Sequence, residues 1–124
     1  MTDKNLNIAV SYYTAMLNKN YDEMASCLHS NIHFIGPLAI MDGKESVVEA
    51  AKNFSMFFKN LTIREKFHNG DKVMLALEFD CPEPIGIFRG ASLLSFTDNL
   101  ISRIELFYDA RPFAKKKEEI FNQN

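Results

Sequence analysis

Side chains that can move a proton gather near the end of the chain, in the alternating segment Leu100–Pro112. Read with the two-residue period of a β-strand, one face carries charged groups and one ring: Arg103, Glu105, Phe107, Asp109 and Arg111. The opposite face is mostly apolar: Ser102, Ile104, Leu106, Tyr108 and Ala110. A strand face that mixes carboxylates with arginine is either wetted by solvent or lines a polar cavity, where it can supply a general acid or base.

Both interpretations of the charged face stay open at this level. Asp109 either ends the strand as a carboxylate paired with Arg111, or acts as an acid/base group. A desolvated carboxylate has a raised pKa, nearer to working pH, whereas a neighbouring arginine opposes that shift and holds the carboxylate ionised. Arg103 and Glu105 fit a solvated face or a cross-strand charge pair better than a reactive site.

The composition is that of an ordinary globular protein and argues against several classes of function. The 124 residues are 47% hydrophobic and 24% charged, which suits one domain with its own core. A formal net charge of −2 argues against nucleic-acid binding, which needs a clustered positive surface. No stretch is long enough to span a bilayer, and the N-terminal residues lack the pattern of a signal peptide. We therefore predict a cytoplasmic protein that acts without membrane or nucleic acid.

The same scan finds no pattern for a metal site, a disulfide or a cofactor. Cys27 and Cys81 lie far apart without metal or redox spacing, which predicts two buried, reduced thiols. The histidines His29, His33 and His68 are equally scattered. Glycine-rich phosphate loops and a serine nucleophile elbow are absent from the sequence, so we expect neither cofactor nor metal.

The elements that must position the charged strand come in two blocks. Apolar residues at helical spacing and capping patterns predict helices over three stretches: residues 6–17, 20–28 and 42–58. Alternating residues between turn signals predict strands: Ile32–Ile35, Leu61–Phe67, Lys72–Phe79, Phe88–Phe96 and Leu100–Pro112. Helices followed by an antiparallel meander are typical of an α+β fold.

Four segments in this order resemble a known superfamily: Tyr12-Tyr13, Asn31–Pro37, Gly43–Val48 and Arg103–Asp109. The chain is similar to the nuclear transport factor 2-like (NTF2-like) superfamily, in its SnoaL-like and ketosteroid-isomerase-like branch. The resemblance implies a cone-shaped, cystatin-like fold, with N-terminal helices on a curved, mainly antiparallel sheet that encloses an apolar pocket. It also implies one domain over residues 1–113, a polar tail over residues 114–124, and a homodimer formed through the outer face of the sheet.

The resemblance allows the ketosteroid-isomerase residues to be placed one by one. That chemistry needs a carboxylate base, with a tyrosine and a protonated acid as the oxyanion hole. The base position falls at Gly36, which cannot move a proton, the tyrosine at Tyr12, and the second acid at about Ser92. The related epoxide-hydrolase set is incomplete as well, because Arg89 and Asp109 are present but Ala91 stands where an acid is needed.

The resemblance also sends the charged face of the last strand toward the pocket and leaves Ile104, Leu106 and Tyr108 on the outer face. Asp109 would then be the general acid or base, and Tyr12 would stabilise developing oxygen charge. An apolar substrate would contact the remaining predicted site residues: Phe34, Phe54, Phe58, Ser92, Phe107 and Arg111. Met56 is a further candidate for the pocket wall.

Two classes of function follow from these residues. The first is a cofactor-independent isomerase, cyclase or hydrolase that acts on an apolar cyclic substrate by acid/base chemistry. The second is a non-catalytic domain of the same fold that binds a small ligand or dimerises. Gly36 favours the second class and an inward Asp109 favours the first, so the orientation of Asp109 discriminates between them.

Overall fold

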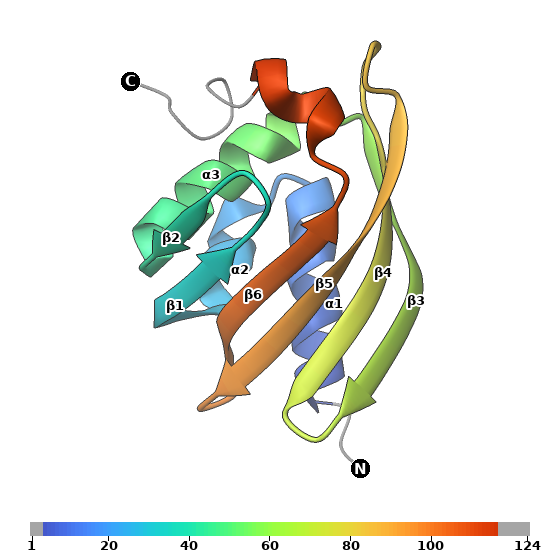
Figure 1. Cartoon of the computed structure of the whole chain (residues 1–124). Helices are drawn as coiled ribbons and strands as arrows, with labels where there is room; N and C mark the ends of the chain where they lie inside the picture. The colour runs from blue at the N-terminus through green and yellow to red at the C-terminus, as the bar shows by residue number, and fades with distance from the viewer. Residues whose placement is uncertain (1–3, 117–124) are drawn as a thin grey trace.

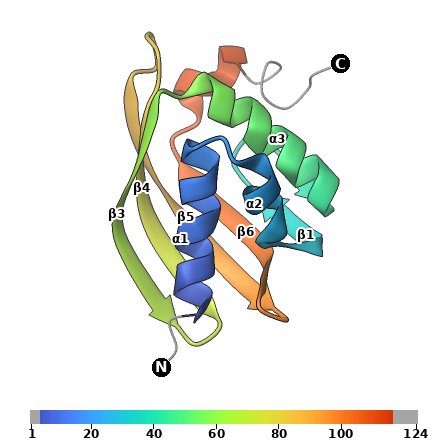
Figure 2. The same cartoon turned by 180° about the vertical axis from the view of Figure 1, so that it is seen from behind.

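A computed structural model describes residues 4–116 of the chain, with side chains up to Phe113. Six strands form one curved, open sheet, and three helices cover one of its faces (Figures 1 and 2). None of the described helices covers the other face of the sheet (Figure 1). The predicted α+β architecture, with helices packed on a curved sheet, is therefore confirmed.

The helices begin where the sequence supplies caps. They are α1 (Lys4–Leu17), α2 (Tyr21–Ser26) and α3 (Lys44–Phe57). At the start of α2 the side chain of Asn20 accepts a hydrogen bond from the backbone N–H of Glu23 at 3.3 Å, as the capping pattern predicts. The turn before α3 needs a positive φ of 95° at Gly43, a conformation that glycine adopts without strain.

The sheet is mixed, with strand order β2-β1-β6-β5-β4-β3. The strands are β1 (Leu28–Ile35), β2 (Ile40–Asp42), β3 (Asn60–Asn69), β4 (Lys72–Asp80), β5 (Ile87–Thr97) and β6 (Leu100–Tyr108). Strands β3 to β6 form the predicted antiparallel meander, whereas β1 pairs with β6 in parallel. The parallel pair brings the N-terminal part of the chain beside its last strand (Figure 1).

Two local predictions were wrong in this region. The second helix ends at Ser26, and the polar residues after it belong to β1, which begins at Leu28. The pairing of β1 with β6 is irregular between Leu28 and His33, because a bulge holds residues that do not alternate. The three-residue strand β2 was missed, since its order comes from pairing with β1 rather than from its own pattern.

The orientation of β6 is opposite to the one that the resemblance implied. Ile101 and Ile104 are fully buried against the helices, and Leu106 packs against the same core. Phe107, which was expected in the cavity, is half exposed on the outer face, although part of the residue also contributes to the cavity lining. Desolvation explains the outcome, because burying apolar residues is favourable while burying unpaired charges beside them is costly.

The chain after β6 turns back over one end of the domain. A short 3₁₀ helix, η1 (Arg111–Lys116), follows the sheet and lies beside the C-terminal end of α3 (Figure 1). The predicted domain boundary at residue 113 thus falls inside η1, and residues 117–124 of the predicted polar tail lie outside the described residues. Among the described helices, none combines the length and the apolarity that crossing a bilayer requires.

Candidate functional site: an apolar cavity between helices and sheet

A cavity of about 70 Å³ lies between the helices and the concave face of the sheet. Its wall is built from α1, α3, β1, β4, β5, β6 and η1, and includes Met16, Val47 and Leu77. Among the described residues, no aspartate, glutamate, histidine, lysine or arginine lines the cavity. Its polar side-chain groups are tyrosine hydroxyls, so its chemistry is that of neutral hydrogen-bond donors in an apolar wall.

Aromatic rings form a continuous wall from α3 to the end of the sheet. The ring of Phe54 lies 5.2 Å from that of Phe79, and Phe79 stacks on Phe88 at 4.9 Å with an angle of 11° between planes. Phe113 of η1 meets Phe88 edge-on at 4.8 Å and Tyr108 at 5.6 Å. Such pairs are favourable beyond their buried area, so this end of the cavity is closed by packed rings.

The best-defined polar contact beside the cavity joins α1 to β5. Tyr13 Oη donates a hydrogen bond of 2.8 Å to Ser92 Oγ, and both residues are buried. Burial raises the pKa of Tyr13 to about 12, so this hydroxyl stays protonated at physiological pH. Because each hydroxyl satisfies the other, this pair is a structural contact between helix and sheet.

Tyr12, the neighbouring residue, has a different environment. Its ring packs edge-on against that of Tyr13 at 4.9 Å and lines the cavity. Its hydroxyl makes no hydrogen bond to any described residue, although every fully buried side-chain oxygen or nitrogen among them has a partner. The Tyr12 hydroxyl is therefore not fully enclosed by protein atoms, although the residue as a whole is only 2% exposed. Burial raises its pKa well above the usual value, so it is a neutral donor.

The remaining predicted pocket residues divide into two groups. Phe34, Phe54 and Phe107 contribute to the cavity lining, although Phe107 is also half exposed. Phe58 lies behind it, buried between the rings of Phe54 and Phe79, and Ser92 is held by Tyr13. Met56 is 61% exposed, so its expected place in the wall is wrong.

Asp109 does not point into the cavity. Its carboxylate accepts hydrogen bonds from the Arg111 guanidinium at 2.9 and 2.7 Å and from the Arg111 backbone N–H at 3.0 Å. The side chains of Asp109 and Arg111 are 54% and 90% exposed. The hydrogen bonds from Arg111 lower the pKa of Asp109 to about 2, which suits a permanently ionised surface group. The expected inward orientation of Asp109 and Arg111 is wrong, because their pairing in water avoids the cost of desolvation.

The other charged groups of the sheet lie on its outer face or rim. Arg103 pairs with Glu105 at 3.6 Å, and Arg89 with Glu78 at 3.0 Å. Gly36, the expected position of an isomerase base, follows β1 and donates its backbone N–H to the carbonyl of Ala39. Across the described part of the chain, no group of three or more potential metal-ligating side chains comes together.

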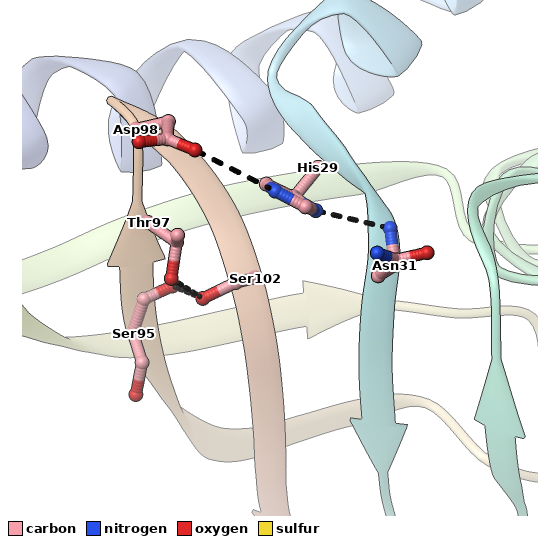
Figure 3. Close-up of polar contacts among 6 residues, drawn as sticks. All are labelled: His29, Asn31, Ser95, Thr97, Asp98 and Ser102. Atoms are coloured by element: carbon pink, nitrogen blue, oxygen red, sulfur yellow. Dashed lines mark hydrogen bonds and ion pairs between the residues drawn. The ribbon is translucent and has the colours of Figure 1, made fainter.

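A polar cluster at the end of the sheet away from η1 has a structural explanation. Figure 3 shows His29 of the β1 bulge between the backbone of Asn31 and the turn that joins β5 to β6. His29 Nδ1 accepts the Asn31 N–H at 3.0 Å, and Nε2 lies 4.0 Å from Asp98 Oδ2. Thr97 and Ser102 hydrogen-bond to each other across the same turn at 3.0 Å. These contacts tie the bulge to the hairpin.

Sequence reasoning left much of the cavity wall unassigned, and Tyr13, Tyr108 and Phe113 show why. Tyr13 was placed in the core, but its link to Ser92 spans 79 positions and has no local signal. Tyr108 was assigned to the outer face, although its own apolar neighbours on alternate positions indicated the inner one. Phe113 stood at the end of the predicted domain, and its position beside Pro112 gave no sign of burial.

Comparisons with known proteins identify a family match and similar folds for this chain. The model of the SnoaL-like domain family matches residues 9–104. No curated protein matches the chain at a significant level. An NTF2-like protein from Cytophaga hutchinsonii is 17% identical, with a TM-score of 0.77 over 88% of this chain and 93% of its own.

Two further solved structures show how little the fold alone says about activity. A steroid delta-isomerase from Pseudomonas aeruginosa is 14% identical, with a TM-score of 0.79 over 98% of this chain and 91% of its own. A de novo designed protein with a curved β-sheet is 15% identical, with a TM-score of 0.86 over 98% of both chains. An enzyme and a designed scaffold share this backbone, so function must be argued from the cavity.

Proposed function

The chain belongs to the SnoaL-like domain family, and on that premise we propose that it binds a small, uncharged, apolar molecule without acid/base catalysis. The observation that carries this proposal is the lining of the cavity, which among the described residues offers hydroxyls and no group that titrates near neutral pH. General acid/base catalysis needs a group that can exchange a proton within hydrogen-bond reach of the ligand. A wall of rings and aliphatic side chains instead favours binding by exclusion of water.

Tyr12 is the group that we assign to ligand recognition. Its hydroxyl is neutral, has no hydrogen-bond partner among the described residues and belongs to a ring of the cavity wall. A neutral donor in an apolar wall suits a ligand with one carbonyl or ether oxygen on a hydrocarbon frame. A charged ligand is disfavoured, because the lining holds no counter-charge and desolvating an ion is costly.

Acetophenone, an uncharged aromatic ketone, is a suitable probe for this proposal. Titration calorimetry with the wild-type protein should detect saturable binding, and chromatography should recover the ketone unchanged. Tyr12→Phe should weaken binding about three- to tenfold, the equivalent of one hydrogen bond worth about 0.5–1.5 kcal/mol. Tyr21→Phe, outside the cavity lining, is the matched control. Absence of saturable binding, or equal affinities in all three proteins, would contradict the proposal.

The uncovered face of the sheet supports a second proposal, a homodimer. Cross-strand neighbours place a band of apolar side chains on this face: Ile35, Ile40, Phe67, Met74, Ala76, Ala91, Leu93 and Phe107. Among the described residues, five large apolar side chains are at least half exposed, and four of them lie on strands: Ile40, Phe67, Ile87 and Phe107. An apolar face flanked by ion pairs, such as Arg89 with Glu78, suits a second copy of itself.

The oligomeric state in solution tests the dimer. Sedimentation velocity should give a dimer for the wild-type chain and a monomer for Leu93→Arg, because a charge would be buried at the centre of the band. Thr62→Arg adds the same side chain to an exposed position of β3 outside the band and should leave the dimer intact. A wild-type monomer at all concentrations would overturn this second proposal and leave ligand binding untouched.

The thiols fit the cytoplasmic location that the sequence predicts. Cys27 and Cys81 are both free and buried, and burial raises the pKa of Cys81 to about 11. Unpaired thiols are usual in a reducing compartment. We include the cytoplasm in the proposal on this ground, and fractionation of cells that express the native gene tests it.

A further inference from the structure

The cavity beside the 3₁₀ helix η1 is small for the ligand proposed above. The cavity holds about 70 Å³, whereas sites for drug-sized ligands measure roughly 300–1,000 Å³. Even an engineered apolar cavity that binds benzene has about 150 Å³. An aromatic ligand of the kind proposed above therefore needs space that a side chain now fills.

Phe113 is the side chain best placed to provide that space. It is 1% exposed, lines the cavity and comes from the last described element of the chain. Its ring centroid lies 4.8 Å from Phe88, 5.6 Å from Tyr108 and 6.4 Å from Phe57. These rings come from β5, β6 and α3, so Phe113 fills the space between the sheet and the end of the third helix.

The polar contacts given for residues 109–113 stay within the segment itself. The Phe113 backbone N–H donates to the carbonyl of Ala110 at 2.9 Å, and Arg111 binds Asp109. Both contacts stay within five consecutive residues and can move with the segment. Arg111 and Pro112 are exposed. Among residues 109–113, the ring of Phe113 is the group that packs against rings of α3, β5 and β6.

From these observations we infer that Phe113 determines which ligands the cavity accepts, because its ring occupies the place that a ligand ring takes on binding. The inference rests on the proposed ligand-binding function and adds the identity of the displaced group. On binding, the segment after Tyr108 swings outward and the ligand ring replaces Phe113 against Phe88 and Tyr108. The closed form keeps water out of an empty apolar site. A larger ligand has to displace Phe113 further, so the ring discriminates by size.

A comparison of two ketones tests this role. Dissociation constants for acetophenone, with one ring, and 2-acetylnaphthalene, with two, are measured by titration calorimetry on the wild-type protein and on Phe113→Ala. The variant should bind both compounds more tightly, and the preference for the two-ring ketone should rise at least tenfold. Pro112→Ala changes an exposed residue of the same segment and should leave both constants unchanged.

The outcomes separate this inference from the function on which it rests. If both ketones bind but their ratio is the same in wild type and Phe113→Ala, Phe113 does not set ligand size and the inference is overturned. If neither ketone binds either protein, the proposed ligand class fails and the inference fails with it.

Hydrogen exchange on the wild-type protein provides a test that does not depend on a variant that folds. The backbone amide of Phe113 should exchange at least a hundredfold faster than those of Ile101 and Ile104 in β6, because the segment opens without unfolding the sheet. Saturating acetophenone should make the Phe113 amide exchange faster still. Equal protection of all three amides would show that the segment opens only when the domain unfolds, and would overturn the inference.

Discussion

Adjacent residues of the same strands lie on opposite faces of the sheet, and the two faces differ in burial and charge. On β6, Ile104 is fully buried beneath the helices, while its neighbour Arg103 pairs with Glu105 at 3.6 Å on the outer side. On β5, Ser92 and Leu94 are buried, whereas Leu93 between them joins the outer apolar band. The charge of these strands lies outside, whereas the buried hydroxyl of Ser92 lies inside. This division favours a binding cavity over an acid/base site.

The largest expected effect is a difference in the free energy of unfolding between two substitutions, one on each face of the sheet. Leu94→Ala should lower the free energy of unfolding by about 2–5 kcal/mol, because it leaves a cavity in a closed core. Leu93→Ala, the same change one residue earlier, should cost about 1 kcal/mol or less in the monomer. Urea denaturation at low protein concentration measures both. Similar losses for the two variants would contradict the assignment of faces.

The next largest effect on stability is expected from the buried hydroxyl pair of Tyr13 and Ser92. Tyr13→Phe should lower the free energy of unfolding by about 1–3 kcal/mol, because the buried Ser92 hydroxyl loses its partner. Adding Ser92→Ala should then restore part of that stability, since neither oxygen is left unpaired. A double-mutant cycle measures the coupling. Independent, additive losses would mean that the 2.8 Å contact does not stabilise the inner face.

The third prediction concerns the charge pair of Asp109 and Arg111 at the rim of the sheet. Breaking this pair should change the pKa of Asp109 and have little effect on the cavity. Arg111 lowers the pKa of Asp109 to about 2, so the favourable interaction is present above the unfolded pKa and is lost as the pH falls through about 2. Arg111→Ala should raise the pKa of Asp109 toward its usual value, as followed by carboxyl NMR. An unchanged pKa in that variant would show that another group holds the carboxylate.

Much of this fold follows from the sequence, because the patterns that specify it are local. The capping box at Asn20, the hairpin turn at Gly70 and the alternation of β4 each predict their element without reference to the rest of the chain. The missed strand β2 and the bulge of β1 depend on their partners. Their positions follow from pairing across the sheet, which no short window of sequence contains.

The candidate site was less predictable, and the orientation of β6 shows why. Its own pattern, with Ile104, Leu106 and Tyr108 on one face, favours burying that face. The family resemblance implied the reverse, and physical patterning was the better guide. Phe113 could not be assigned at all, since its burial depends on rings from three other elements. Tyr12, by contrast, was expected in the pocket and lines the cavity, while its role in binding stays a prediction.

The most direct test of the central claim is the pH dependence of acetophenone binding. Acetophenone does not ionise, Tyr13 and Tyr108 have pKa values raised to about 12, and the pKa of Tyr12 is raised as well. The dissociation constant should therefore be the same within twofold from pH 5 to pH 9, and Asp109→Asn should leave it unchanged at every pH. A tenfold change with a midpoint in that range, removed by Asp109→Asn, would place an acid/base group at the ligand and contradict the account.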